Sequence, residues 1–435
     1  MRPHPIGLPL ALLVLTALSA CNLSSAPVGN PLATSPPSTA PAHLPTTVVP
    51  TATIATPETP APTPEPASPT PVDLSSFPSV IWMGRLSLTQ GWVYSDGRLL
   101  WTDDAGSSWS DITPAGLSNC PEPDICSIVS PPVFLDSSHV RIAVIRGQEC
   151  APPTTLSFMH TENGGRSWGL WHIADFADSL ICPGNACISG ADLEFPDPQN
   201  GWLAAYAPLG MSSDVTYLYR TMDGGQTWTA LKMPLSGQVT FIDGSTGWAV
   251  GGESRWTSDQ LLRTQNGGSS WQPVSLDFPE SYIETGYYLQ EPAFLSHEIG
   301  VLPVRFYRDE DNNQLMGFYT THNAGGAWSL TATLQEQDLN TFGRGSPIPW
   351  SAIDESTWFV ALSDATQYLT RDRGQTWEVF PSAGLGGAKL LEVQFASVVE
   401  GWGLGQICDE DSGCAQPMFA THDGGHTWIP VAPAP

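Results

Sequence analysis

The stretch Thr221-Met222-Asp223-Gly224-Gly225-Gln226-Thr227-Trp228 contains a spacing that returns seven times in this chain. Each copy has Thr, then Asp or Asn two residues later, Gly four residues later and Trp seven residues later. The copies recur roughly every 50 residues, and a repeat of that length predicts a ring of β-sheet blades. The seven copies span residues 102–109, 161–168, 221–228, 264–271, 321–328, 370–377 and 421–428.

Residues 238–276 indicate how one copy fits into a blade. Two short β-rich runs, 238–242 and 247–250, are separated by turn residues. Two further runs, 260–264 and 271–276, flank the tight turn of the copy itself. Similar first hairpins precede the other six copies. We therefore predict an all-β fold, a seven-bladed β-propeller of four-stranded antiparallel blades, over residues 76–435.

Each residue type of the repeat has a physical role in a tight turn. An Asp or Asn side chain can accept hydrogen bonds from nearby backbone N–H groups, and Gly tolerates a positive φ. Trp is a large apolar plate that fills the space between sheets. Calcium binding is the alternative, but no copy has the dense acidic series of an EF-hand. We predict structural roles for Asp104, Asn163, Asp223, Asn266, Asn323, Asp372, Asp423, Trp109, Trp168, Trp228, Trp271, Trp328, Trp377 and Trp428.

The first 75 residues divide into a targeting segment and a tether. Residues 1–20 have a polar start and an apolar run too short for a permanent membrane span, so they predict a signal peptide. The Leu18-Ser19-Ala20-Cys21 sequence resembles a bacterial lipobox, which implies lipid on Cys21; ordinary secretion is the alternative. Residues 21–75 are rich in Pro, Thr and Ser, and predict a disordered linker. We expect an extracytoplasmic protein, lipid-anchored to the cell membrane.

The charge balance restricts the class of partner. The chain has 16 basic and 43 acidic side chains, and without Arg2, Glu58, Glu65 and Asp73 the remainder carries 15 and 40, a balance of −25. This excess of negative charge disfavours nucleic acid, and it disfavours contact of the propeller body with anionic lipids. We expect no nucleic acid and contact with the membrane only through the lipid anchor. We also expect a monomer.

Seven cysteines follow Cys21, and six of them form pairs that are close in sequence. In an exported protein such pairs predict short-range disulfides. Cys150 is left over, and could be a free thiol or compete for Cys120 or Cys126. Zinc at residues 182–187 is a weaker alternative because no matching ligands lie nearby in sequence. No metal or cofactor is predicted. The predicted disulfides are Cys120–Cys126, Cys182–Cys187 and Cys408–Cys414.

The topology of a blade places the long loops on one side of the ring. The short turns between strands 1 and 2, and between strands 3 and 4, share one face. The long insertions lie between strands 2 and 3 or between blades, and therefore share the other face, where binding residues are expected to concentrate. Two acidic stretches there, 308–313 and 409–411, could also hold calcium. The candidate ligand residues on this face are Trp171, Trp256, Tyr282, Tyr287, Tyr288, Arg305, Tyr307, Arg308, Arg344 and Trp350, with Arg255 beside them.

The repeat resembles the Asp-box, or BNR repeat, which in other propellers closes the hairpin between strands 3 and 4. Across residues 79–431 the chain resembles the Ycf48 (Hcf136)-like photosystem II assembly factors, whose repeats have the form seen at 241–271 and 395–428. Sortilin-type propellers are the next nearest. The resemblance implies a protein-binding role. Those assembly factors use a basic, Arg-lined surface, and this acidic domain departs from that pattern.

The residues support two classes of function. The first is a lipid-anchored extracellular propeller that binds a protein or glycan through its long-loop face, as an assembly-factor-like scaffold would. The second is a BNR-type glycoside hydrolase resembling a sialidase. The Arg-Ile-Pro context of the first sialidase arginine is absent, and Arg85 stands in Met83-Gly84-Arg85-Leu86 instead. We therefore favour binding over catalysis and name no catalytic residue.

Overall fold

The computed structural model describes residues 77–118, 125–148, 151–176, 188, 190–208, 214–252, 259–282, 286–308, 313–335, 347–362, 366–409 and 413–434. The chain divides into two units, 1–68 and 69–435, and every described residue belongs to the second. The predicted signal peptide, Cys21 and the linker lie outside the described residues. The described helices, α1 (Ala115–Ser118) and η2 (Glu280–Tyr282), are too short to cross a bilayer.

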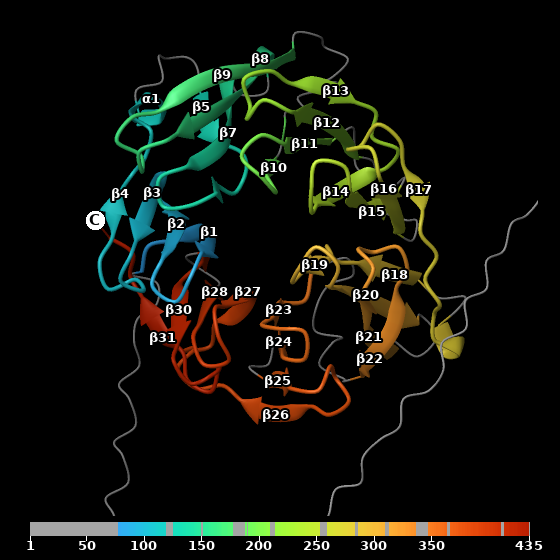
Figure 1. Cartoon of the computed structure of the whole chain (residues 1–435). Helices are drawn as coiled ribbons and strands as arrows, with labels where there is room; N and C mark the ends of the chain where they lie inside the picture. Colours follow the sequence, from blue (N-terminus) through green and yellow to red (C-terminus); the bar gives the residue numbers. More distant parts are fainter. Residues whose placement is uncertain are drawn as a thin grey trace, which may run out of the picture. The chain divides into compact units, whose positions relative to one another are not determined.

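The described strands form seven sheets arranged around a centre, which confirms the predicted seven-bladed propeller (Figure 1). Four blades contain four strands each. Blade 1 has β1 (Val80–Arg85), β2 (Gly91–Ser95), β3 (Arg98–Thr102) and β4 (Ser110–Asp111); blade 3 has β10 (Gly190–Glu194), β11 (Gly201–Pro208), β12 (Asp214–Thr221) and β13 (Thr229–Leu231); blade 4 has β14 (Ser236–Phe241), β15 (Gly247–Gly252), β16 (Gln260–Thr264) and β17 (Gln272–Pro273); blade 6 has β23 (Trp350–Ala352), β24 (Trp358–Ala361), β25 (Thr366–Thr370) and β26 (Glu378–Pro381).

The other three blades have the same four-stranded order and one additional short strand. Blade 2 has β5 (Ile125–Ile128), β6 (Val133–Phe134), β7 (Val140–Gln148), β8 (Ala151–Thr161) and β9 (Gly169–Phe176); blade 5 has β18 (Gly286–Leu289), β19 (Ala293–Phe294), β20 (Gly300–Arg308), β21 (Asn313–Thr321) and β22 (Ser329–Leu334); blade 7 has β27 (Lys389–Phe395), β28 (Gly401–Asp409), β29 (Gly413–Ala415), β30 (Met418–Thr421) and β31 (Ile429–Val431).

In blades 2 and 5 the innermost strand is interrupted at a proline. β5 and β6 both pair with β7, and β18 and β19 both pair with β20. Pro132 and Pro292 stand in the two gaps, where a residue without an N–H cannot donate to the ladder. In blade 5 this interruption also contains Glu291.

All neighbouring strands within a blade are antiparallel. In blade 3, for example, Gly201 pairs with Thr221 and Trp202 with Arg220. Antiparallel order puts the turns between strands 1 and 2 on one side of the ring, together with the seven repeat turns, which we call Asp-box turns after the pattern they resemble. We call this side the Asp-box face. The turns between strands 2 and 3 and the connections between blades lie on the other side, the long-loop face.

The seven Asp-box turns share one hydrogen-bond pattern. In each, the Thr hydroxyl donates to the Asp or Asn side chain at 2.8–3.0 Å and accepts from the N–H of the box Gly at 2.7–3.0 Å. The same side-chain oxygen accepts the N–H of the residue before Trp at 2.8–2.9 Å. A buried Thr and a carboxylate or amide therefore hold the turn closed.

The box Trp side chains lie where neighbouring blades meet. Trp428 of blade 7 is 1% exposed and packs with Phe359 of blade 6. Trp377 of blade 6 lies 5.5 Å from Phe318 of blade 5, measured between ring centroids. Trp109, Trp328 and Trp428 are buried, whereas Trp168, Trp228, Trp271 and Trp377 are half-buried. Much of the hydrophobic core therefore lies between adjacent blades.

The ring closes without any strand shared between blades 7 and 1, since each sheet contains only consecutive strands. Gln394 on β27 accepts the N–H of Arg85 at 3.0 Å and donates to the carbonyl of Met83 at 3.2 Å. The N–H of Val80 donates to the carbonyl of Gln416 at 2.9 Å. A side-chain amide and one backbone contact therefore link the two ends of the ring.

Candidate functional site

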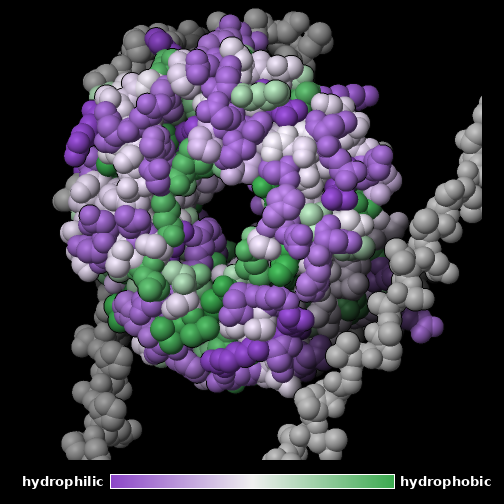
Figure 2. Space-filling model, viewed as in Figure 1, coloured by the Kyte–Doolittle hydropathy of each residue, from purple (hydrophilic) through white to green (hydrophobic). Residues whose placement is uncertain are grey.

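A cavity of about 840 Å³ lies among the inner strands of blades 3 to 7. The space-filling view shows an opening at the centre of the ring, with hydrophobic residues along part of its wall (Figure 2). The cavity volume falls within the range typical of ligand-binding pockets. We call it the channel pocket. Its polar and aromatic lining consists of Glu194, Gln238, Thr240, Tyr288, Gln290, Glu291, Arg305, Trp350, Ser351, Glu392 and Gln394.

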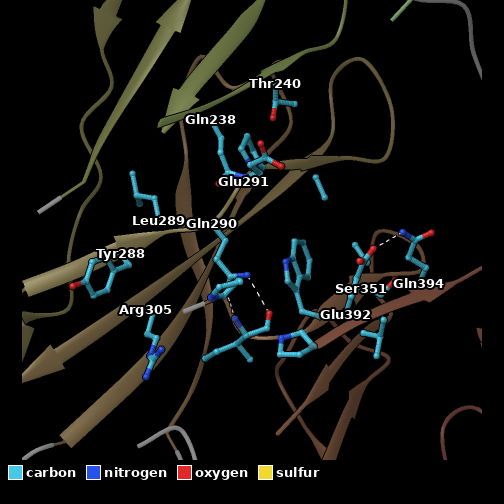
Figure 3. A pocket seen from close by; sticks show the side chains of 18 of the residues that line it. Gln238, Thr240, Tyr288, Leu289, Gln290, Glu291, Arg305, Ser351, Glu392 and Gln394 are labelled. Atoms are coloured by element: carbon cyan, nitrogen blue, oxygen red, sulfur yellow. Dashed lines mark hydrogen bonds between the residues drawn. The ribbon is translucent and has the colours of Figure 1, made fainter. Parts of the chain in front are cut away.

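Three residues of the predicted ligand face meet at this pocket: Tyr288, Arg305 and Trp350. Tyr288 on β18 pairs with Arg305 on β20, and both positions are at the long-loop end of blade 5. Trp350 begins β23 in blade 6 and packs edge-on against Phe318. Figure 3 shows Tyr288 and Arg305 on neighbouring strands at one side of the pocket. The long-loop end of the pocket is thus aromatic and contains a cation.

The other described residues of the predicted face are not among those that line the pocket. Tyr282 is 4% exposed and Tyr287 is half-buried, and both pack into the core of blade 5. Trp171 stacks on His160 with centroids 3.7 Å apart, in blade 2. Tyr307 stacks on Tyr288 at 5.3 Å and Arg308 ends β20. Arg255, Trp256 and Arg344 lie outside the described residues.

The sequence reading missed the carboxylates of the pocket. Glu194 ends β10, Glu392 lies on β27, and Glu291 occupies the interruption between β18 and β19. Asp192, two residues before Glu194, accepts a hydrogen bond from Tyr206. The sequence does contain a pattern that could have predicted these carboxylates: polar residues stand at alternate positions of the innermost strands. Every second side chain of a strand points to the same face, so such residues would face the channel together.

The carboxylates differ in their hydrogen-bond partners. Glu194 accepts the backbone N–H of Phe241 at 2.7 Å, and Glu392 accepts the Gln394 amide at 2.6 Å. Among the described residues, Glu291 has no hydrogen-bond partner, and none of Asp192, Glu194, Glu291 and Glu392 forms an ion pair. Gln290, next to Glu291, points to blade 6 and bonds Ile348 (Figure 3).

Burial and mutual repulsion shift the titration of these groups. Burial and the nearby charge of Asp192 raise the pKa of Glu291 to about 8. Burial, and then the charge of Glu291, raise the pKa of Glu194 well above its ordinary value. Burial likewise raises the pKa of Asp192 and of Glu392. Three of these acids, Asp192, Glu194 and Glu291, therefore form one interacting electrostatic group.

The cations near the pocket lie toward the long-loop face. Arg305 is 3% exposed and its Nε donates to Gln314 Oε1 at 2.6 Å. Burial lowers the pKa of Arg305 to about 10, and burial together with Arg305 lowers the pKa of Lys389 on β27. The inner strands thus present cationic groups near one end of the channel and acidic groups further along it.

Several other arginines serve the scaffold. The guanidinium of Arg141 lies 4.0 Å from the Phe195 ring centroid and donates to the Pro198 carbonyl at 2.7 Å. Arg220 lies over Trp202 and donates to the Gly244 carbonyl at 2.7 Å. Each of these arginines caps the turn of the following blade. They are consequently occupied on the Asp-box side of the ring.

The described cysteines are oxidised. Cys408 and Cys414 form a disulfide across the β28–β29 hairpin, with Cα atoms 4.0 Å apart. Cys126 is also disulfide-bonded. Cys120, Cys150, Cys182 and Cys187 lie outside the described residues. Among the residues that are described, no group of three or more His, Cys, Asp or Glu side chains is arranged to hold a metal ion.

No protein-family model matches the chain. Over 262 residues it is 22% identical to the photosystem II assembly lipoprotein Ycf48 of Synechococcus sp. (strain CC9902), covering 54% of this chain and 73% of that protein. A solved structure of YCF48 bound to D1 peptide is 16% identical, with a TM-score of 0.46 over 82% of this chain and 99% of that one. A PL25 ulvan lyase is 9% identical, with a TM-score of 0.43 over 69% and 81% of the two chains. The sequence relative supports the predicted resemblance to Ycf48-like propellers.

Proposed function

We propose that this protein is a lipid-anchored, extracytoplasmic propeller that binds a protein partner through its long-loop face, as a monomeric scaffold resembling an assembly factor. The observation that carries the proposal is the channel pocket, where Tyr288, Arg305 and Trp350 gather at the long-loop end. Aromatic and Arg side chains around a cavity form a suitable anchor for a partner. The relative named as an assembly lipoprotein supports both the scaffold role and the anchor.

The binding face can be located by site-specific crosslinking in the native envelope. A photoreactive p-benzoylphenylalanine replaces Tyr307, which stacks on Tyr288 at the rim of the pocket. The matched control carries the same group at Met222, which is 66% exposed on the Asp-box face. We expect one defined protein adduct from position 307 and none from position 222. Equal adducts from both positions, or adducts only from 222, would contradict the proposed face.

The proposed anchor has its own test. Cys21→Ser should remove incorporation of labelled palmitate and release the protein from the membrane fraction, since the acylated thiol is lost. The exported protein should otherwise fold unchanged. Retention of Cys21→Ser in the membrane fraction after a high-salt wash would show that lipid on this residue is not what holds the protein there.

Glycan hydrolysis is the alternative because the channel pocket contains several carboxylates, and glycoside hydrolases require a placed carboxylate pair. A raised pKa, as at Glu291, would also suit a general acid. Activity assays on a panel of fluorogenic glycosides test the hydrolase alternative. Turnover that is lost in Glu291→Gln, but kept in Glu298→Gln on the Asp-box face, would favour the hydrolase over the scaffold.

A further inference from the structure

We propose that the channel pocket binds an organic cation, an ammonium or guanidinium group, between its glutamates and the indole of Trp350. The inference deepens the proposed function and rests on it where the cation is carried by a protein partner. Three glutamates from three blades, Glu194, Glu291 and Glu392, line one cavity. A cavity of about 840 Å³ is large enough for an extended side chain together with part of its backbone.

The pocket glutamates lack the cationic partners that carboxyl groups have elsewhere in the described part of the chain. Among the described residues none of these three carboxylates is in an ion pair, and Glu291 lacks any hydrogen-bond partner. Elsewhere on the described surface carboxylates do find cations: Glu378 pairs with Arg371 at 2.7 Å, and Glu355 pairs with Arg373. Burial first, and then a neighbouring acid, raises the pKa of both Glu194 and Glu291; the neighbour is Glu291 for Glu194 and Asp192 for Glu291. A bound cation would relieve that repulsion.

The pocket also has an apolar lining, which is an observation independent of the acids. Pro347, Ile348, Pro349 and Trp350 line the pocket as one continuous segment of blade 6, with Leu289 and Pro292 of blade 5 beside it. Such a wall suits an aliphatic stem, and an indole face attracts a cation. An amphipathic cation such as a lysine or arginine side chain matches the acidic and the apolar parts of the lining at once, whereas an inorganic ion would use only the acidic part.

The backbone around Glu291 is held in place by its neighbours in the sequence. Pro292 interrupts the first strand of blade 5, and the N–H of Gln290 donates to the Pro303 carbonyl at 3.0 Å. The side chain of Gln290 is directed to Ile348 of the next blade, at 3.1 Å from Nε2 to the carbonyl oxygen. The chain is therefore fixed on either side of Glu291, which leaves its carboxylate facing the cavity (Figure 3). A preorganised group loses little freedom when it binds.

Calorimetric titration of the full chain at pH 7 tests the inference, with cadaverine as the lysine-like probe and agmatine as the guanidinium probe. Pentane-1,5-diol is the neutral control. We expect binding of both cations and none of the diol. Glu291→Gln should weaken cation binding about tenfold or more, the effect of losing one charge-assisted contact. Trp350→Ala should weaken it about two- to fivefold. The matched control Glu298→Gln, exposed on the Asp-box face, should bind as the original chain does.

Repeating the titration in two buffers of different ionisation enthalpy gives a second readout. A cation favours the ionised carboxylate, so its binding should release protons at pH 7, and Glu291→Gln should reduce that release. A purely structural role for Glu291 would leave the proton count unchanged. A melting temperature of Glu291→Gln at pH 7 that is no lower than that of the original chain would show that weaker binding does not come from misfolding. Equal affinity of Glu291→Gln and Glu298→Gln, or an affinity for the diol like that for cadaverine, would overturn the inference.

Two peptide arms distinguish the source of the cation. A blocked peptide with a single Lys is compared with the same peptide carrying norleucine. Stronger binding of the Lys peptide than of cadaverine assigns the site to a partner's side chain, whereas cadaverine binding without peptide binding assigns it to a free amine. Both outcomes support a cation site, and the absence of any cation binding overturns it. The crosslinking experiment at position 307 tests the partner face separately, so the two proposals can fail independently.

Discussion

At the scale of single residues, the backbone of the Asp-box turn is strained in the copies that have a residue other than glycine immediately before the box Gly. The residue before the box Gly has a positive φ in all seven copies, and it is Ala105, Ala324 or Arg373 in three of them. Its N–H donates to a carbonyl in the first turn of the same blade, as Ala324 does to Glu298 at 3.0 Å. The conformation is therefore required by a hydrogen bond that joins the two turns of the blade.

Ala324→Gly should raise the free energy of unfolding by about 0.5–1 kcal/mol. The left-handed conformation costs a residue with a Cβ about 1–2 kcal/mol, and the greater freedom of Gly in the unfolded chain offsets part of the gain. Thermal melting measures the change. At the box Gly itself, Gly425→Ala should destabilise, because φ is +93° and a new Cβ would lie 2.7 Å from Phe359. A lower melting temperature for Ala324→Gly would refute this account of the turn.

The roles of the Asp-box residues could be predicted from the sequence because their contacts are local. Thr221, Asp223 and Gly225 bond to one another within a few residues, so spacing alone determines the geometry. Glu194, Glu291 and Glu392 lie far apart in the sequence and meet only after three blades have been placed around the ring. Tyr287 and Tyr288 show the limit within one strand: one enters the core and the other lines the pocket.

At the scale of elements, the packing between adjacent blades decides stability. Trp428 is 1% exposed against Phe359 and Phe395, whereas Trp377 is half-buried. Trp428→Ala should therefore lower the free energy of unfolding by about 3–5 kcal/mol, and Trp377→Ala by less. Denaturant titration gives both values. Equal losses would indicate that exposed area at the seam does not govern the contribution of these side chains.

The contact between blades 7 and 1 can be tested through Gln394. Gln394→Ala leaves the N–H of Arg85 and the carbonyl of Met83 without their side-chain partner, which should cost about 1–3 kcal/mol. We expect hydrogen exchange to accelerate first in β1 and β27. Gln290→Ala, at the seam between blades 5 and 6, is the matched control and should affect β18 and β23 instead. Identical exchange maps for the two variants would argue that neither amide holds its seam.

At the scale of the whole molecule, two groups of acids give opposite dependences of stability on pH. Hydrogen bonds from Ser108 and then from Thr102 lower the pKa of Asp104 to about 2. A lowered folded-state pKa means that this stabilisation is present above the unfolded pKa and is lost as pH falls toward 2. The channel acids behave in the opposite way, because their folded-state pKa values are raised.

We therefore expect stability to decline as pH rises from about 4.5 to about 8, the interval between the ordinary pKa of Glu291 and its raised value. Within this interval the folded state binds more protons than the unfolded state. Glu291→Gln removes one of the acids with a raised pKa and should flatten the decline in melting temperature between pH 5 and 8. Glu298→Gln should leave the slope unchanged. A slope in Glu291→Gln equal to that of the original chain would contradict the assignment.

Because each sheet is built from consecutive strands, no blade needs both ends of the polypeptide. The polypeptide could therefore begin at any blade while the blades keep the same order around the ring. A linker from β31 to β1 would run from an outermost to an innermost strand, as every natural connection between these blades does. Circular permutants that start at blade 2, 3 or any later blade should therefore assemble the same seven sheets. A tether could then be attached before any blade without a change in the fold.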